Sequence, residues 1–363
     1  MAKKHNLFYL LFFFFFCIVS FILIRTIVYH RQSDLATSVP QAQTLPLLSN
    51  EETVGQLFVW GIPGTTLSSD SAELIANTHP AGVILMGEFT QDELRKITDE
   101  IRQIPMKVPL FIAIDGEGGT VTHLKEDKLP GGKILGFLND DDFCQIIASR
   151  SALLLANGIN TNFGIIGDIG WNNQTYMNAR AYSNRPEDVA HKVSLAIQCS
   201  TVISAVKHFP GHGDSSINSH YRIPTIMKDE KTWKLEDGLP FLNAIENSAD
   251  MIMIGHIRYT KIASEPASLS KKFHDVLKEN KFQGLVITDD LGMLEQSGYK
   301  PDAAVRQAIE AGNDLLLITT STTSPEELYT NFLKEAMQSP TLMQTIQNRV
   351  NTTLRFKSKH FSF

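Results

Sequence analysis

The sequence predicts a (β/α)8 barrel, in which eight parallel strands form a closed cylinder surrounded by helices. From residue 51 onward, short apolar runs alternate with longer mixed segments of helical character, the pattern of repeated βα units. Eight such runs occur, and roughly 310 residues suit eight units in one domain. The runs are almost entirely apolar, as expected for strands that are buried on both faces. A doubly wound open sheet is the alternative.

The N-terminal part of the chain differs in character from the rest. Residues 1–31 hold a basic start, MAKKH, and an apolar run from Leu7 to Ile24 of about 18 residues, long enough to span a bilayer. No small-residue cleavage site follows the run closely, so we expect an uncleaved transmembrane helix that acts as a signal anchor. Residues 32–50 are polar and read as a linker, and residues 51–363 as the barrel domain. We expect the barrel outside the cytoplasm, although the flanking charges orient the anchor only weakly.

The barrel domain contains eight candidate strands in order along the chain. Each is a run of about five to seven residues that lies between segments of mixed polarity. The predicted strands are residues 56–62, 82–86, 110–114, 161–166, 202–206, 251–255, 284–288 and 314–318.

Composition excludes several classes of function. The chain is 43% hydrophobic and 20% charged, which indicates a globular protein with a large core. A net charge of -6 provides no basic stripe for nucleic acid, so we expect no nucleic-acid partner. Outside the apolar run only Cys144 and Cys199 occur, which is too few for a disulfide framework and says little about the redox compartment.

Ionisable side chains follow five of the eight strands at the point where each strand ends. In a barrel these ends converge on one mouth, where active sites lie. A single aspartate there is often only a helix cap, but five strands that end alike favour a shared site. The residues concerned are Asp115, Asp168, Lys207, His208, His256, Asp289 and Asp290.

The segment KHFPGHGDSSINSH, residues 207–220, is the most unusual stretch of the chain. Its histidines at 208, 212 and 220, together with Asp214, are residue types that bind zinc or iron, but Pro and Gly prevent a helical pair of ligands. A purely structural loop is a second interpretation. The third is glycoside chemistry, in which Asp289 attacks the anomeric carbon and a histidine with a pKa near the working pH transfers the proton.

The segment resembles a signature of glycoside hydrolase family 3, in its NagZ-like branch of β-N-acetylglucosaminidases (β-N-acetylhexosaminidases). That signature is KHFPGHG followed by an aspartate, serine and histidine. Further similar segments occur in the same order from about residue 52 to 320: VGQLFVWGIPG, GVILM, IDGEGGTV, NFGIIGDI, ARAYS, ADMIMIGHIRY, VITDDLGM and AVRQAIEAGNDLLLI. The fold of this family is a (β/α)8 barrel.

The resemblance implies a mechanism and a set of site residues. It implies that Asp289 is the nucleophile and His220 the general acid/base, with retention through a covalent glycosyl-enzyme. It also implies that the sugar is held by Asp115, Arg180, Lys207 and His208, which have the hydrogen-bonding groups to contact hydroxyls. The reaction would need no metal and no organic cofactor.

The sequence departs from the family pattern at three positions. Asn218 stands where the family has the aspartate that partners the catalytic histidine, so we expect a lower pKa for His220 and weaker catalysis. Asp214 is a candidate substitute for the missing carboxylate. Thr120 and Gly116 replace an arginine and a glutamine that are usual in IDGEGGTV, and neither is a residue assigned to chemistry.

Two functions follow as hypotheses. The first is a retaining exo-β-N-acetylglucosaminidase that removes terminal N-acetylglucosamine from peptidoglycan fragments or related muropeptides, with a phosphorylase that uses phosphate in place of water as a variant. The second is a membrane-tethered protein that binds N-acetylglucosamine but turns over little because of Asn218.

Overall fold

The computed structural model describes residues 45–171, 176–212, 215, 217 and 222–362. Residues from Pro46 onward form one compact unit, and the account below concerns that unit. The transmembrane helix predicted within residues 1–31 lies outside the described residues. Within them, each helix is too short or too polar to cross a bilayer.

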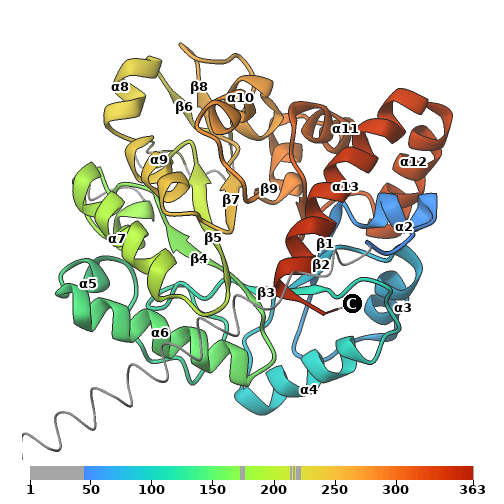
Figure 1. Cartoon of the computed structure of the whole chain (residues 1–363), viewed down its shortest axis with the longest axis horizontal. Helices are drawn as coiled ribbons and strands as arrows, with labels where there is room; N and C mark the ends of the chain where they lie inside the picture. The colour runs from blue at the N-terminus through green and yellow to red at the C-terminus, as the bar shows by residue number, and fades with distance from the viewer. Residues whose placement is uncertain (1–44, 172–175, 213–214, 216, 218–221, 363) are drawn as a thin grey trace, which may run out of the picture. The chain divides into compact units, whose positions relative to one another are not determined.

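Eight parallel strands form a barrel, as predicted (Figure 1). Their order around the barrel is β10-β1-β2-β3-β4-β5-β7-β9. A parallel bridge between Ile287 and Leu315, and a hydrogen bond of 2.8 Å from the Asp314 amide to the Val286 carbonyl, join β9 to β10 and close the barrel. An open sheet is therefore excluded. The strands are β1 (Phe58–Ile62), β2 (Gly82–Leu85), β3 (Phe111–Ile114), β4 (Thr161–Ile166), β5 (Ile203–Phe209), β7 (Met251–Ile254), β9 (Leu285–Thr288) and β10 (Leu316–Ile318).

Helices surround the barrel, and their sequences explain where they begin. Helix α4 (Gln91–Arg102) begins with a capping box between Thr90 and Glu93. Its buried residues recur at helical spacing and form the face that packs on the barrel. Proline occupies the first turn of α7, α9, α11, α12 and α13, where its missing N–H costs nothing. The remaining helices and their bounds are α2 (Asn50–Gly55), α3 (Ser69–Thr78), α5 (Gly132–Gly136), α6 (Asp140–Ala156), α7 (Pro186–Cys199), α8 (Glu230–Leu235), α9 (Leu239–Glu246), α10 (Lys271–Glu279), α11 (Pro301–Ala311), α12 (Pro325–Gln338) and α13 (Pro340–His360).

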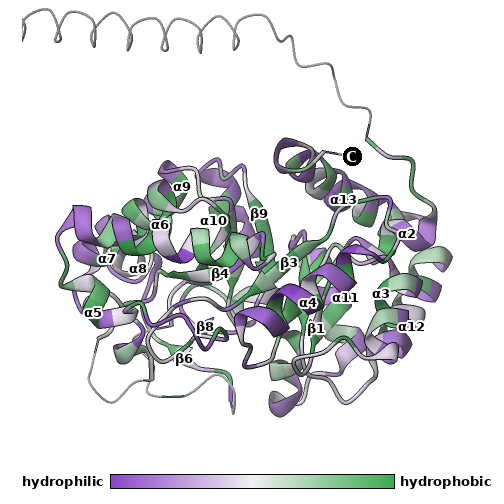
Figure 2. Cartoon of the chain, turned by 90° about the horizontal axis from the view of Figure 1, so that it is seen from below, coloured by the Kyte–Doolittle hydropathy of each residue, from purple (hydrophilic) through white to green (hydrophobic). Residues whose placement is uncertain are grey.

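The hydrophobic core has an inner and an outer part, because successive strand residues point to opposite faces. Alternate residues such as Ala113, Ala205 and Met253 gather in one buried cluster inside the barrel. Their neighbours Ile112 and Ile252 belong to two other clusters, which also contain helix residues. In Figure 2 the barrel strands are mostly hydrophobic, whereas the surrounding helices carry both hydrophobic and hydrophilic residues.

Lys357, near the end of α13, closes the floor of the barrel at the N-terminal ends of three strands. Its ammonium group donates to the carbonyls of Ala81 and Pro109, both at 2.7 Å, and to Oε1 of Gln56 at 3.2 Å. It also lies 4.6 Å from the centre of the Phe111 ring. The side chain is fully buried, and this burial lowers the pKa of Lys357 well below its usual value.

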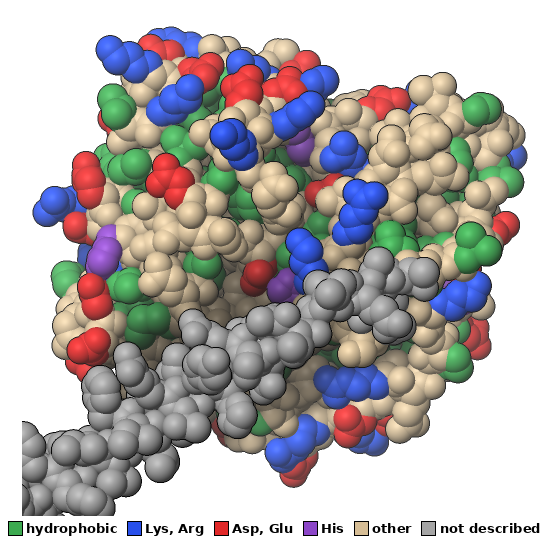
Figure 3. All heavy atoms as spheres, in the orientation of Figure 1, with side chains coloured by type: hydrophobic (Ala, Val, Ile, Leu, Met, Phe, Trp, Pro, Cys, Tyr) green, Lys and Arg blue, Asp and Glu red, His purple; other side chains and the backbone are tan. Residues whose placement is uncertain are grey.

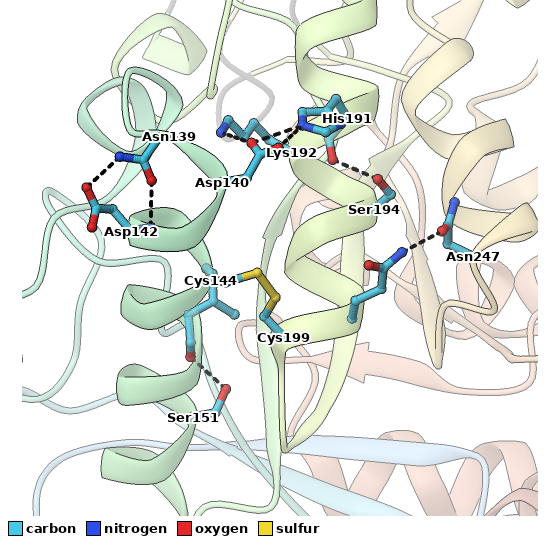
Figure 4. Close-up of a disulfide and its surroundings, with 12 residues drawn as sticks. Asn139, Asp140, Asp142, Cys144, Ser151, His191, Lys192, Ser194, Cys199 and Asn247 are labelled. Atoms are coloured by element: carbon cyan, nitrogen blue, oxygen red, sulfur yellow. Dashed lines mark hydrogen bonds and ion pairs between the residues drawn. A yellow bond between two sulfur atoms is a disulfide. The ribbon is translucent and has the colours of Figure 1, made fainter. Parts of the chain in front are cut away.

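A disulfide between Cys144 and Cys199 joins α6 to α7, with the two Cα atoms 5.3 Å apart (Figure 4). Two cysteines were too few to predict a disulfide framework from the sequence, and here they bond to each other. On the same pair of helices, Asp140 accepts from Lys192 at 3.0 Å and lies 2.9 Å from His191. The two helices are thus connected both covalently and by ion pairs.

A short two-stranded ribbon stands beside the barrel. It consists of β6 (Thr225–Ile226) and β8 (Arg258–Tyr259), which pair in parallel. Residues of β6 follow the KHFPGHG segment, and β8 follows β7. The ribbon therefore places Tyr259 near the loops that leave the C-terminal ends of the strands.

Candidate active site

Lys207 and Arg180 share the buried carboxylate of Glu117 at the mouth of the barrel. Nζ of Lys207 lies 2.6 Å from Oδ1 of Asp115 and 2.8 Å from Oε1 of Glu117. The Arg180 guanidinium donates to both oxygens of Glu117, at 2.6 and 2.8 Å. Asp115 and Glu117 both follow β3, and Lys207 lies in β5. The result is an alternating chain of two cations and two anions from three parts of the sequence.

Charge decides the protonation state of this cluster. Burial by itself would raise the pKa of Glu117, but the charges and hydrogen bonds of Lys207 and Arg180 lower it to about 2. Burial would likewise lower the pKa of Lys207, and the carboxylates of Asp115 and Glu117 raise it instead. Glu117 and Lys207 are therefore both ionised at neutral pH, and the cluster presents fixed donors and acceptors to a ligand.

Asp168, just after β4, holds the beginning of the KHFPGHG segment. Its Oδ2 accepts from the His208 amide at 3.0 Å and lies 2.6 Å from Nδ1 of His208. Its Oδ1 accepts from the His212 amide at 2.5 Å. Burial would raise the pKa of Asp168, but His208 lowers it, whereas burial lowers the pKa of His212 to about 4. Asp168 thus fixes the His208 ring, and His212 is neutral at neutral pH.

Asp289 follows β9 and is half-buried at the mouth. Its amide donates to the Ile254 carbonyl at 2.8 Å, and its Oδ1 accepts from the Asp290 amide at 2.8 Å. Burial would raise the pKa of Asp289, but the charges of His208 and His256 and the amide bond lower it to about 2. Asp289 is therefore an ionised carboxylate that interacts electrostatically with His208 and His256.

The neighbouring Asp290 has a structural task. Its carboxylate accepts from the hydroxyls of Thr319 and Thr320 at 2.6 and 2.8 Å, and from the amides of Gly292 and Thr319. It therefore ties the end of β9 to the end of β10. Both ring nitrogens of His256 are also hydrogen-bonded, because Nδ1 lies 2.7 Å from the Ser268 hydroxyl and Nε2 lies 2.8 Å from the Asp290 carbonyl.

Comparison with known proteins identifies the family. A model described as the glycosyl hydrolase family 3 N terminal domain matches residues 49–356, most of the chain. The chain belongs to glycosyl hydrolase family 3. It is a glycoside hydrolase, and the resemblance of the KHFPGHG segment to the NagZ-like branch is confirmed.

Named relatives agree with this assignment. A beta-hexosaminidase of Alkalilimnicola ehrlichii is 32% identical over 279 residues, which is 72% of this chain and 80% of the relative. The structure resembles a family 3 beta-N-acetylglucosaminidase from Paenibacillus sp. str. FPU-7, with a TM-score of 0.78 at 28% identity, over 87% of this chain and 64% of that one. It also resembles a beta-N-acetylhexosaminidase from Beutenbergia cavernae, with a TM-score of 0.78 at 25% identity, over 86% of this chain and 99% of that one.

The structure brings together five of the seven residues that the family resemblance assigned to the site. Lys207 contacts Asp115 directly and Arg180 through Glu117, while His208 lies near Asp289. Their roles in binding and catalysis stay predictions. The remaining two, His220 and Asn218, lie outside the described residues, as does Asp214.

Two residues of this family 3 site were not assigned a role from sequence. Glu117 stands two residues after Asp115 in IDGEGG, and this spacing is the signal that it belongs to the same mouth. Asp168 was noted at a strand end but equally well read as a cap. The metal interpretation gains no support from the described part of the chain, where no three His, Cys, Asp or Glu side chains are grouped to hold an ion.

Charged side chains elsewhere are dispersed. Over the face seen in Figure 3, Lys and Arg side chains lie among Asp and Glu side chains. This face is thus unlike the basic surface of a nucleic-acid-binding protein.

Proposed function

We propose that this chain is a retaining exo-β-N-acetylglucosaminidase that removes terminal N-acetylglucosamine, with peptidoglycan fragments as the natural substrates. The observation that carries the proposal is the half-buried, ionised Asp289 at the barrel mouth, within electrostatic reach of His208 and of Lys207 in the buried ion-pair cluster. The names of the curated relative and of the two solved structures support the choice of sugar.

The reaction proceeds in two displacements. The Asp289 carboxylate attacks the anomeric carbon while the bond to the leaving oxygen breaks, and His220 gives its proton to that oxygen. His220 then removes a proton from water, which attacks the glycosyl-enzyme and releases the sugar with its original configuration. A carboxylate with a pKa of about 2 is a weak base, so it attacks carbon rather than taking the acid's proton.

The cluster beside Asp289 holds the sugar. Asp115 accepts from hydroxyls, while Lys207 and Arg180 donate to hydroxyl or acetamido oxygens. Because Glu117 already neutralises part of the charge of both cations, they bind a neutral sugar without demanding an anionic ligand.

We place the barrel outside the cytoplasm, tethered by the apolar segment within residues 1–31. The disulfide between Cys144 and Cys199 supports this placement, because disulfides persist in oxidising compartments and are rare in the cytosol. Muropeptides of the cell wall would be available there.

A binding protein with little turnover is the second candidate, and Asn218 is the observation that favours it.

Purified full-length chain in detergent should release 4-nitrophenol from 4-nitrophenyl N-acetyl-β-D-glucosaminide. Asp289→Ala should abolish release, and Asn218→Asp should increase it. Wild-type protein that binds N-acetylglucosamine but releases no nitrophenol would favour the binding protein.

Product analysis separates two versions of the enzyme. A hydrolase yields N-acetylglucosamine whether or not phosphate is present. A phosphorylase yields the sugar 1-phosphate when phosphate is added.

A further inference from the structure

Residues 208–212, here termed the 208–212 turn, are held from two opposite sides. On the inner side, the amides of His208 and His212 donate to Asp168. On the outer side, the Pro210 carbonyl accepts from Nε1 of Trp233 at 2.7 Å, and the Gly211 carbonyl lies 3.0 Å from the Tyr259 hydroxyl. The inner contacts belong to the site described above, whereas the outer ones lead to a second buried carboxylate.

That carboxylate is Asp237, between α8 and α9. Its Oδ1 accepts from Nε1 of Trp171 at 2.5 Å, and its Oδ2 accepts from Nζ of Lys228 at 2.6 Å. The Tyr259 hydroxyl lies 3.0 Å from the same Oδ2. Asp237 is only 1% exposed, so these contacts form in a medium where hydrogen bonds to a charge are strong.

The turn also packs directly on Asp237. Gly211 has a φ of 118°, and a Cβ at this position would lie 2.7 Å from Cβ of Asp237. Only glycine leaves room for so close an approach. The position of Gly211 is therefore set by the position of Asp237.

Asp237 also reaches the loop after β4. Trp171 lies in that loop, which continues to Arg180 of the sugar-binding cluster, and Nζ of Lys228 lies 4.5 Å from the centre of the Trp171 ring. One carboxylate thus joins two loops of the barrel mouth to β8. One loop leads to Arg180 and the other to His220, the proposed acid/base.

We propose that Asp237 is a positioning residue for the glycosidase site: through Tyr259 and Trp171 it fixes the 208–212 turn and the loop after β4 relative to each other. The proposal rests on the proposed function, because it concerns how that site is held. Asp237 acts on the reaction through these neighbours and not on the sugar.

Asp237→Asn in the full-length chain tests the proposal, since the amide keeps the shape but not the charge that holds Lys228. A small displacement of catalytic groups costs on the order of 10- to 100-fold in rate, so kcat should fall by about that factor. KM should change by less than about threefold, because Arg180 remains held by both carboxylate oxygens of Glu117, and Lys207 by Asp115 and Glu117. Hydrogen exchange of the Gly211 and His212 amides, both hydrogen-bonded in the turn, should accelerate while exchange in β2 stays unchanged.

Glu236→Gln is the matched control. Glu236 pairs with the same Lys228 at 3.0 Å, and its side chain is 36% exposed. This variant should keep wild-type kcat and wild-type exchange in the turn.

Three outcomes decide the question. An Asp237→Asn variant with a lower melting temperature but unchanged kcat and unchanged turn exchange would overturn the proposal. If wild type releases no nitrophenol, the proposed function fails, and the exchange measurement alone still decides whether Asp237 holds the turn. If Asp237→Asn does not fold, Tyr259→Phe removes one link of the same network, and it should lower kcat and accelerate exchange in the turn.

Discussion

At the scale of residues, the site depends on charges that compensate one another out of water. Glu117 shows this most clearly, because burial raises its pKa and two cations lower it further than burial raises it. Removing one charged member therefore lowers the free energy of unfolding by more than the loss of its own contacts would, since its partners are left buried with unbalanced charge.

Glu117→Gln should weaken both binding and stability. Lys207 and Arg180 would face each other across a neutral amide, so KM should rise and the free energy of unfolding should fall by about 3 kcal/mol. Kinetics on the 4-nitrophenyl sugar and urea unfolding measure the two effects. Glu126→Gln, an exposed change a few residues along, should leave both unaltered; equal losses in the two variants would contradict the role of Glu117.

The pH dependence follows from the same shifts. The pKa values of Glu117 and Asp289 are about 2 in the folded protein, against usual values of 4.5 and 3.8. The unfolded chain therefore binds protons at these groups more tightly than the folded protein does. Their contribution to stability is full above about pH 5 and is lost as pH falls towards 2. Between about pH 5 and pH 2 the free energy of unfolding, measured by circular dichroism, should fall less for Glu117→Gln than for wild type, because the variant has lost one of the two groups that titrate.

Activity should titrate through a different group. Since Asp289 is ionised above about pH 3, the alkaline limb of kcat/KM reports loss of the proton on His220. Asn218→Asp should move this limb upward by about one pH unit, because a carboxylate stabilises the protonated ring. Identical limbs in both proteins would mean that residue 218 does not contact His220.

How far the site could be predicted from sequence depends on how each residue is placed. Asp115 and Asp289 could be predicted because they follow buried strands, and strand ends converge. The role of Glu117 could not, since it depends on two partners, Lys207 and Arg180, that lie 90 and 63 residues away along the chain. Asp237 could not either, because its importance lies in the approach of Gly211.

At the scale of elements, the eight strands begin within two residues of their predicted positions. The apolar runs decide this, because a strand buried on both faces admits few polar residues. The exception is the end of β5, which continues to Phe209 through Lys207 and His208. Two polar residues read as loop, yet here Asp115 and Asp168 satisfy them within the barrel mouth.

The disulfide between α6 and α7 could not be predicted from the sequence, because the pairing of two cysteines depends on how the two helices lie side by side. Its loop of 55 residues corresponds to about 4 kcal/mol of loop-closure entropy in the unfolded chain. Cys144→Ser should therefore lower the melting temperature by about 6 °C for a domain of this size.

Scanning calorimetry with and without a reductant checks this prediction. The reductant should lower the wild-type melting temperature and leave that of Cys144→Ser unchanged. A wild type that is insensitive to complete reduction would contradict a stabilising role for the bond.

At the scale of the whole molecule, the two ends of the barrel have different tasks. The mouth carries the ionised cluster, while the floor is closed by the ammonium of Lys357 against two backbone carbonyls and Gln56. Three acceptors match the three protons of a charged ammonium, which offsets part of its desolvation.

Lys357→Met keeps much of the length but leaves the buried oxygens without their donor. We expect a loss of about 3 kcal/mol in the free energy of unfolding, with kcat unchanged because the mouth is at the opposite end. Lys359→Met, exposed on the same helix, should unfold like wild type. Loss of kcat without loss of stability in Lys357→Met would contradict this division of tasks.

The floor has a consequence for the order of events during synthesis. Lys357 follows its three partners in the sequence by 248 to 301 residues. At the usual pace of translation, about 5 to 20 residues per second, the first strands emerge some 12 to 60 s before the lysine that satisfies them. The nascent barrel therefore lacks its floor until residue 357 has been made, so its first strands must wait for a partner that is added at least 248 residues later.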